Sequence, residues 1–179
     1  YILLYIMLKT VIKPDDFKKR GGKTEIFTPL IETDVIYIPF NQVGKNINDI
    51  IKTKLVDKIE GKCMKDGFVE PGSTSIITIS SGTLVNSDVK YVVAYQASVC
   101  FPVENMVIEC TAKNVTKAGI KATLTKYTKT PMVIFIARDH HYNNDKFNSV
   151  EENDVIRVKI IGQRFELNDE YVSVIAEMA

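Results

Sequence analysis

The sequence predicts an α+β, mostly β protein, and three observations lead to this fold class. Apolar and polar residues alternate in short segments through most of the chain, one stretch has helical spacing, and glycines separate the segments. With 45% hydrophobic residues and a net charge of +1, the composition is ordinary for a packed domain. We therefore expect one helix packed on a small antiparallel sheet, followed by a five-stranded barrel.

Residues 1–24 are expected to form an N-terminal extension. They begin with "YILLYIML", an apolar run that is too short to span a bilayer. A charged stretch with Pro14, Gly21 and Gly22 follows, and such breakers are typical of a tether. We expect no membrane segment here. Because the chain begins with Tyr1, its natural start stays open, and Met7 is a candidate initiator.

Residues 25–102 are expected to form the first domain. A strand-rich segment, 25–40, precedes a helix in which apolar side chains recur every fourth residue, at Ile47, Ile51, Leu55 and Ile59. Asn46 or Asn48 can cap this helix. Short strands should follow, and then a long apolar run that could belong to two sheets. These strands are expected near 59–63, 67–70, 74–80, 82–86 and 89–106.

Residues 103–179 show strand signals only. In the first hairpin Ile108, Cys110 and Ala112 point to one side and alternate with polar residues. Gly119 can reverse the chain, and Gly162 interrupts a later alternation as a barrel corner requires. Five strands with little helix fit an OB-fold barrel. The expected strand segments are 106–114, 119–127, 131–139, 155–168 and 171–178.

Cysteine and histidine spacing argues against a metal or catalytic centre. Cys63, Cys100 and Cys110 lie far apart without a CxxC pair, which favours free, buried thiols in a reducing compartment. "ARDHH", residues 137–141, contains a metal-binding triplet of one phosphoesterase family, but the α/β alternation of that family is missing. We expect no cofactor, no metal and no catalysis by this chain.

Basic residues gather in the barrel half. Six lie between residues 113 and 138 with no acidic residue among them, and acidic residues return directly afterwards. Separated cations with nearby aromatic rings are typical of weak, sequence-tolerant RNA binding, although a solvated surface explains the lysines equally well. Among the aromatic candidates we rank Tyr127 and Tyr142 above Phe135, because Phe135 is expected in the core, and Phe165 is a further candidate. The candidate RNA-binding residues are Lys113, Lys117, Lys121, Lys126, Tyr127, Lys129, Arg138 and Tyr142.

The order of several short motifs resembles the seventh-subunit family of RNA polymerase II and its archaeal counterpart. The motifs are "KTKL", "EGKC", "GFV", "KAGI" and the closing "IRVKIIG…YVSVIAEM". The resemblance covers roughly residues 25–178. "CFPVENM", "IFIARDHH" and "IGQRFELNDEYVSVIAEM" look most like versions encoded by large nucleocytoplasmic DNA viruses. Cellular members usually have glycine where this chain has Asn105.

The resemblance implies a non-catalytic stalk subunit of a multisubunit DNA-directed RNA polymerase. The first, or tip, domain would dock at the clamp base and support initiation, and the OB-fold domain would contact nascent single-stranded RNA. Partners would be the large catalytic subunits and the clamp-base small subunit, while a fourth-subunit-like partner stays open. The expected docking residues are Asn41, Gln42, Val43, Gly44, Lys45, Asn46, Lys65, Asp66, Gly67, Pro71 and Gly72.

Two other functions stay open at this point. A free-standing OB-fold RNA-binding protein would need no polymerase, although it has little use for the first domain. A hydrolase would need metal-dependent turnover that is lost when Asp139 is replaced. A viral chain would be found in cytoplasmic virus factories and the virion, whereas a cellular one would be nuclear.

Overall fold

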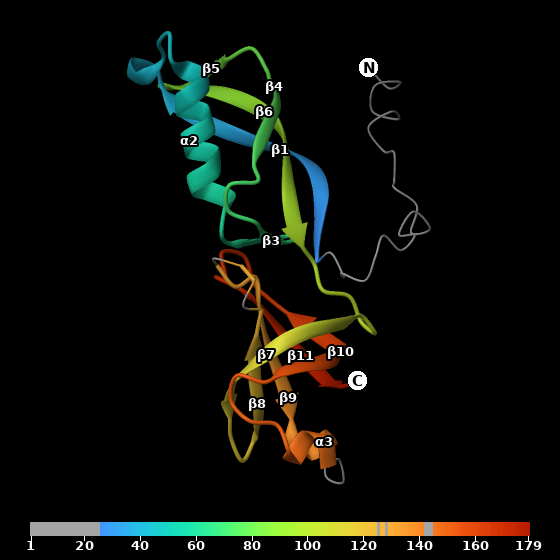
Figure 1. Ribbon diagram of the computed structural model, residues 1–179. Helices are drawn as coiled ribbons and strands as arrows, with labels where there is room; N and C mark the ends of the chain where they lie inside the picture. Colours follow the sequence, from blue (N-terminus) through green and yellow to red (C-terminus); the bar gives the residue numbers. More distant parts are fainter. Residues whose placement is uncertain (1–25, 125, 128, 142–144) are drawn as a thin grey trace, which may run out of the picture.

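The computed structural model describes residues 26–124, 126–127, 129–141 and 145–179. A region of one helix on a sheet is stacked end to end with a β-barrel (Figure 1). We refer to these two parts as the sheet region and the barrel. The extension predicted for residues 1–24 lies outside the described residues.

Two long strands form the centre of the sheet region. β1 (Phe27–Pro39) and β6 (Asp88–Cys100) pair antiparallel over their full length. The other edge of β6 is shared in turn by β3 (Gly67–Val69), β4 (Ser75–Ile79) and β5 (Thr83–Val85), and β2 (Cys63–Met64) pairs with β3. The apolar run therefore stays in one sheet, and the expectation that it could join two is wrong. The residues of this run that follow β6 lead toward the barrel instead.

Helix α2 (Ile47–Ile59) covers one face of this sheet and follows a 3-10 turn, η2 (Phe40–Gln42). The predicted helix is confirmed, and Ile51, Leu55 and Ile59 are fully buried. Asn46 occupies the N-cap position without a side-chain capping bond, so that part of the prediction is wrong. No helix within the described ranges is both long and apolar enough to cross a membrane.

Five strands close the barrel. They are paired in the order β7-β8-β9-β11-β10, and β10 returns to β7. β9 and β11 run parallel and the other pairs antiparallel, which is consistent with an OB-like fold. The strands are β7 (Val107–Val115), β8 (Gly119–Thr123), β9 (Met132–Ala137), β10 (Val155–Arg164) and β11 (Val172–Met178).

The alternation in the barrel strands is as predicted. Ile108, Cys110 and Ala112 are buried, and the register of β10 shifts between Ile160 and Gly162. The expectation of strands only is wrong between β9 and β10. There the chain forms a 3-10 turn, η3 (Arg138–His140), and a short helix, α3 (Asp145–Asn148), whose Phe147 is buried.

The sheet region and the barrel share a core at their junction. Ile26, Cys63, Phe68 and Cys100 belong to the same buried cluster as the barrel interior. The backbone of Cys63 donates to Asp169 O and accepts from Asn168 N–H, both at 2.8 Å. The two regions are therefore joined by packing as well as by the chain.

The connection from β6 to β7 contains a residue in the left-handed backbone region. Asn105 has a φ of +66°, and its N–H donates to Ile160 O at 2.8 Å. Asparagine and glycine tolerate this conformation better than other residues. Asn105 is thus a residue type that can hold this turn in the place of a glycine.

Candidate nucleic-acid and docking surfaces

The β7–β8 hairpin presents basic side chains to solvent. Lys113 lies at a bulge in β7, Lys117 in the turn and Lys121 on β8, and all three are exposed. The turn is closed by Thr116, whose N–H and hydroxyl both donate to Gly119 O. Arg138 joins this group, because its Nη2 lies 3.5 Å from Thr116 O and its guanidinium lies over the Phe147 ring. Four of the predicted RNA-binding residues therefore gather at one end of the barrel.

Phe135 lies beside this basic group, on the outside of the barrel. It is directly opposite Lys121 on β8 and Ile175 on β11, and 40% of its surface is exposed. The expectation that it belongs to the core is wrong. The alternation could have revealed this, because Met132, Ile134 and Ile136 are the buried side of β9.

Gly119 allows this outer face to form. A Cβ at this position would lie 3.0 Å from Phe135 Cζ and would collide with the backbone carbonyl of Ile136. Only glycine therefore permits β8 to approach β9 so closely at its first residue. The result is a face of β8 and β9 on which Phe135 and Lys121 are cross-strand neighbours.

The remaining predicted RNA-binding residues lie elsewhere or outside the described residues. Lys129 Nζ donates to Gly61 O at 2.7 Å, and Tyr127 packs edge-on against Phe27 with the ring centroids 5.2 Å apart. These contacts hold Lys129 and Tyr127 at the junction, next to the exposed Lys126. Tyr142 lies outside the described residues. The structure thus divides the predicted RNA-binding set between two ends of β8.

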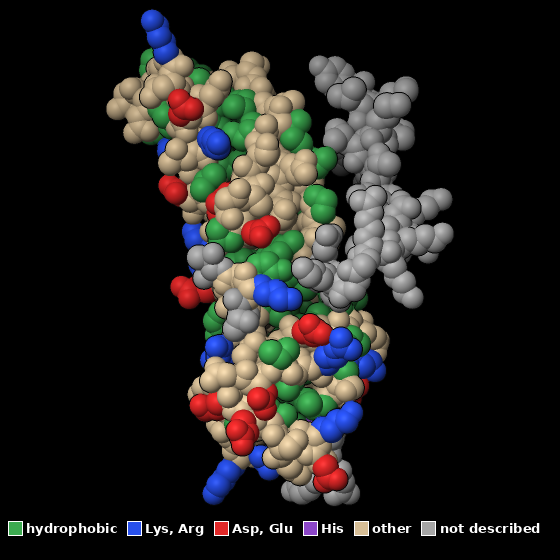
Figure 2. Space-filling model, in the orientation of Figure 1, with side chains coloured by type: hydrophobic (Ala, Val, Ile, Leu, Met, Phe, Trp, Pro, Cys, Tyr) green, Lys and Arg blue, Asp and Glu red, His purple; other side chains and the backbone are tan. Residues whose placement is uncertain are grey.

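Charge on the barrel surface is mixed. Figure 2 shows Lys and Arg side chains interspersed with Asp and Glu side chains, with apolar patches between them. Two ion pairs on β10 contribute to this pattern, Arg157 with Glu109 at 2.8 Å and Lys159 with Glu177 at 3.3 Å. A nucleic acid would therefore meet a local basic group rather than one extended positive field.

The first predicted docking loop lies at the far end of the sheet region. Residues 41–46 are all exposed. Two apolar side chains outside the predicted docking set lie near them, Phe40 at 65% exposure and Leu84 at 63%. Phe40 N–H donates to Ser87 O at 3.1 Å, which ties η2 to the β5–β6 turn.

The second predicted docking segment lies at the opposite end of α2. That helix has 13 residues, which separates its ends by about 20 Å. Gly67 is buried against the backbone of Cys100, and Gly72 N–H donates to Glu60 Oε2 at 2.6 Å. Pro71 lies beside Gly61 near the junction, whereas Lys65 is exposed. The two predicted docking segments therefore do not form one continuous surface.

His141, in the suspected metal-binding triplet, has a structural role. Its Nδ1–H donates to Ala137 O at 2.8 Å, and its Nε2 accepts Met178 N–H at 2.9 Å. Its ring stacks on Phe147 with the centroids 5.0 Å apart. Both nitrogens are thus used in joining the ends of β9 and β11. The described part of the chain contains no group of three or more His, Cys, Asp or Glu side chains that could hold a metal ion.

The three thiols are buried and free, as predicted. Burial, followed by the charge of Asp169, raises the pKa of Cys63 to about 11. Burial also raises the pKa of Cys100 and of Cys110 to about 12. At Cys100 the nearby Cys63 raises the pKa further. Because a thiolate is the reactive form, these residues have the character of packing groups rather than nucleophiles.

No family model matches this chain. A protein of Acanthamoeba polyphaga mimivirus is similar to it and carries the provisional name of a DNA-directed RNA polymerase subunit. The two are 25% identical over 169 residues, which covers 85% of this chain and 81% of the mimivirus protein. A match of this extent includes most of both the sheet region and the barrel.

Proposed function

We propose that this chain is a non-catalytic stalk subunit of a multisubunit DNA-directed RNA polymerase. The observation that carries the proposal is the similarity to the mimivirus polymerase subunit across both regions of the chain. The OB-like barrel beside a sheet region agrees with the domain order of the resembling stalk subunits. If the chain is viral, we expect it in the cytoplasmic virus factory and the virion.

The far end of the sheet region is the proposed docking surface for the polymerase body at the clamp base. Phe40, Val43 and Leu84 are exposed there, next to the Gly44 loop. Burying exposed apolar side chains against a partner is favourable by roughly 25 cal/mol per Å² of apolar surface. We therefore place the docking contact at residues 40–46 and at the β5–β6 turn, and not at the segment near the junction.

The β8–β9 face is the proposed contact for nascent RNA. In OB-folds the second and third strands and the loop between the first two strands commonly bind oligonucleotides. Here that face carries Phe135 as a stacking platform and Lys121 beside it, with Lys113 and Lys117 on the adjoining hairpin. We expect weak, salt-dependent binding with little sequence preference.

Copurification tests the polymerase assignment. The chain would be tagged in its native setting, washed in moderately high salt, and analysed for what remains bound. Recovery of the two largest polymerase subunits in near-equal amounts supports the proposal. Recovery of RNA or ribosomal material without polymerase refutes it and favours the free-standing RNA-binding protein.

A double variant locates the docking surface. Phe40→Ala with Leu84→Ala should reduce polymerase recovery at least fivefold, because the two most exposed of the three apolar side chains on this surface are removed. The matched control is Val155→Ala with Leu167→Ala, which removes exposed apolar side chains from the barrel instead. Equal recovery with both double variants would place the docking contact elsewhere.

A further inference from the structure

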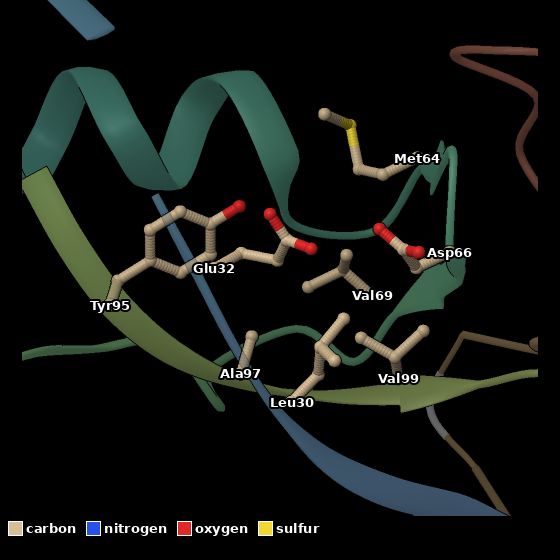
Figure 3. Close-up of a pocket in the computed structure, with 8 residues that line it drawn as sticks. All are labelled: Leu30, Glu32, Met64, Asp66, Val69, Tyr95, Ala97 and Val99. Carbon is tan, nitrogen blue, oxygen red and sulfur yellow. The ribbon is translucent and has the colours of Figure 1, made fainter. Parts of the chain in front are cut away.

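A small hollow opens in the sheet region beyond the C-terminal end of α2 (Figure 3). Its volume is about 20 Å³, and a cavity needs roughly 10–15 Å³ by this measure to hold one water molecule. Leu30, Val69, Ala97 and Val99 form an apolar floor. The hollow therefore has room for one small group above its apolar floor.

The rim of the hollow is acidic and incompletely paired. Glu32 on β1 and Asp66 in the β2–β3 turn direct their carboxylates toward the same space as the Tyr95 hydroxyl (Figure 3). Glu32 has only a long contact with Lys65, at 3.9 Å, and the Lys65 side chain is 73% exposed. Asp66 has no ion pair or hydrogen bond to any described residue. Nearby Asp34, by contrast, is paired with Lys58 at 2.6 Å.

Tyr95 supplies a third polar group that faces the hollow. Only 7% of its surface is exposed, and its hydroxyl makes no hydrogen bond to a residue in the described ranges. Burial, followed by the charges of Asp34, Glu32 and Asp66, raises its pKa to about 12, so the hydroxyl stays protonated. The hydroxyl is not among the fully buried polar atoms that lack a partner, so its oxygen stays accessible to a donor that enters the hollow.

We propose that this hollow binds the ammonium group of a lysine side chain from a neighbouring polypeptide. An ammonium group has three N–H donors, which match the two carboxylates and the Tyr95 oxygen. The methylene stem of lysine suits the apolar floor. The described residues provide no set of three ligand side chains for a metal ion.

That the ammonium group comes from a neighbouring polypeptide rests on the proposed function, in which this chain is one subunit among others. The preference of the hollow for an ammonium group does not depend on the proposed function. Two experiments therefore separate the claims, the first with a small ammonium ion and the purified chain, the second with the native complex.

The first experiment is a methyl NMR titration of the full chain with n-butylammonium chloride at constant ionic strength. We expect saturable shifts at the Leu30, Val69 and Val99 methyls, and none with n-butanol, the neutral analogue of similar size. Glu32→Gln with Asp66→Asn should weaken binding at least fivefold, and Glu104→Gln, an exposed acid on the barrel side, should not. Thermal unfolding would confirm that each variant is folded. Similar shifts with butanol, or unchanged binding to the double variant, would overturn the site.

The second experiment is carbodiimide cross-linking of the native complex followed by peptide mass spectrometry. The reagent joins a carboxylate directly to a lysine nitrogen as an amide and takes up the oxygen lost from the carboxylate as a urea. A bond from Glu32 or Asp66 to a lysine of another polypeptide supports the proposal. Bonds only to Lys65 of the same chain or to a free polyamine, or no bond at either residue, would overturn the partner assignment while leaving the titration result intact.

Discussion

The barrel and the sheet region bury their apolar side chains by different means. Each barrel strand pairs with two neighbours, so the barrel has no open edge and encloses its core. In the sheet region, α2 covers one face only, and β1 pairs with β6 alone among the described strands. Ile31, Tyr37 and Val92 on the other face stay exposed. The comparison indicates that the barrel closes around its core, to which the sheet region adds side chains at the junction, whereas the sheet region leaves apolar side chains on one of its faces exposed.

The largest expected effect comes from breaking barrel closure. Gly119→Val should lower the free energy of unfolding by at least about 4 kcal/mol, because the new side chain collides with the Ile136 backbone, which cannot move without separating β8 from β9. Urea unfolding would measure this loss of unfolding free energy. Gly162→Ala is the matched control, since an added Cβ there meets nothing within 4 Å. A small loss in Gly119→Val would contradict the role assigned to this close approach.

The next effect tests whether the two regions unfold together. Phe68 lies on β3 of the sheet region, but its side chain is fully buried in the cluster that includes the barrel core. Phe68→Ala should cost about 3–5 kcal/mol, within a single unfolding transition. Leu55→Ala, from the separate core under α2, is the comparison. Leu55→Ala could instead split unfolding into two transitions while Phe68→Ala keeps one. That result would show that the sheet region unfolds independently of the barrel.

Alkaline pH should weaken the junction. The Cys63 thiol has its pKa raised from 9.0 to about 11 in the folded chain, so the unfolded chain loses this proton first as the pH rises. Stability from this group is complete below pH 9 and is lost between about pH 9 and 11, by roughly 1–3 kcal/mol. Urea unfolding from pH 8 to 11 would measure this loss, and Cys63→Ala should show a smaller decline. An equally steep decline in that variant would assign the effect to other groups.

The smallest effect separates the two proposed surfaces. Phe135→Ala should reduce affinity for single-stranded RNA roughly tenfold, because a stacking platform contributes about 1–3 kcal/mol per base. Phe40→Ala, which removes an exposed aromatic ring from the sheet region, should leave RNA affinity unchanged. Fluorescence anisotropy with a labelled oligonucleotide would measure both. Equal losses in the two variants would argue against an RNA site on the β8–β9 face.

Local pattern predicted the elements better than it predicted the site. The fourfold spacing of Ile51, Leu55 and Ile59 correctly predicted α2, and the alternation around Cys110 correctly predicted a buried face of β7. Helix α3 was not predicted, because four residues are too few to show a helical period. Phe135 was misjudged because residue type was given more weight than its place in the alternation.

The sequence by itself determined most of the strands, the long helix, the free thiols and the resemblance to a polymerase stalk subunit, because these depend on local spacing and on residue identity. The strand expected near 59–63 is wrong, because α2 continues to Ile59 and β2 begins only at Cys63. Only the tertiary structure decided which distant residues share a surface. Strand pairing placed Phe135 beside Lys121, the length of α2 separated the two docking segments, and packing at the junction engaged Lys129 and Tyr127. The same folding brought Glu32, Asp66 and Tyr95 around one hollow. Such proximities arise from pairing across long stretches of chain, which no local pattern records.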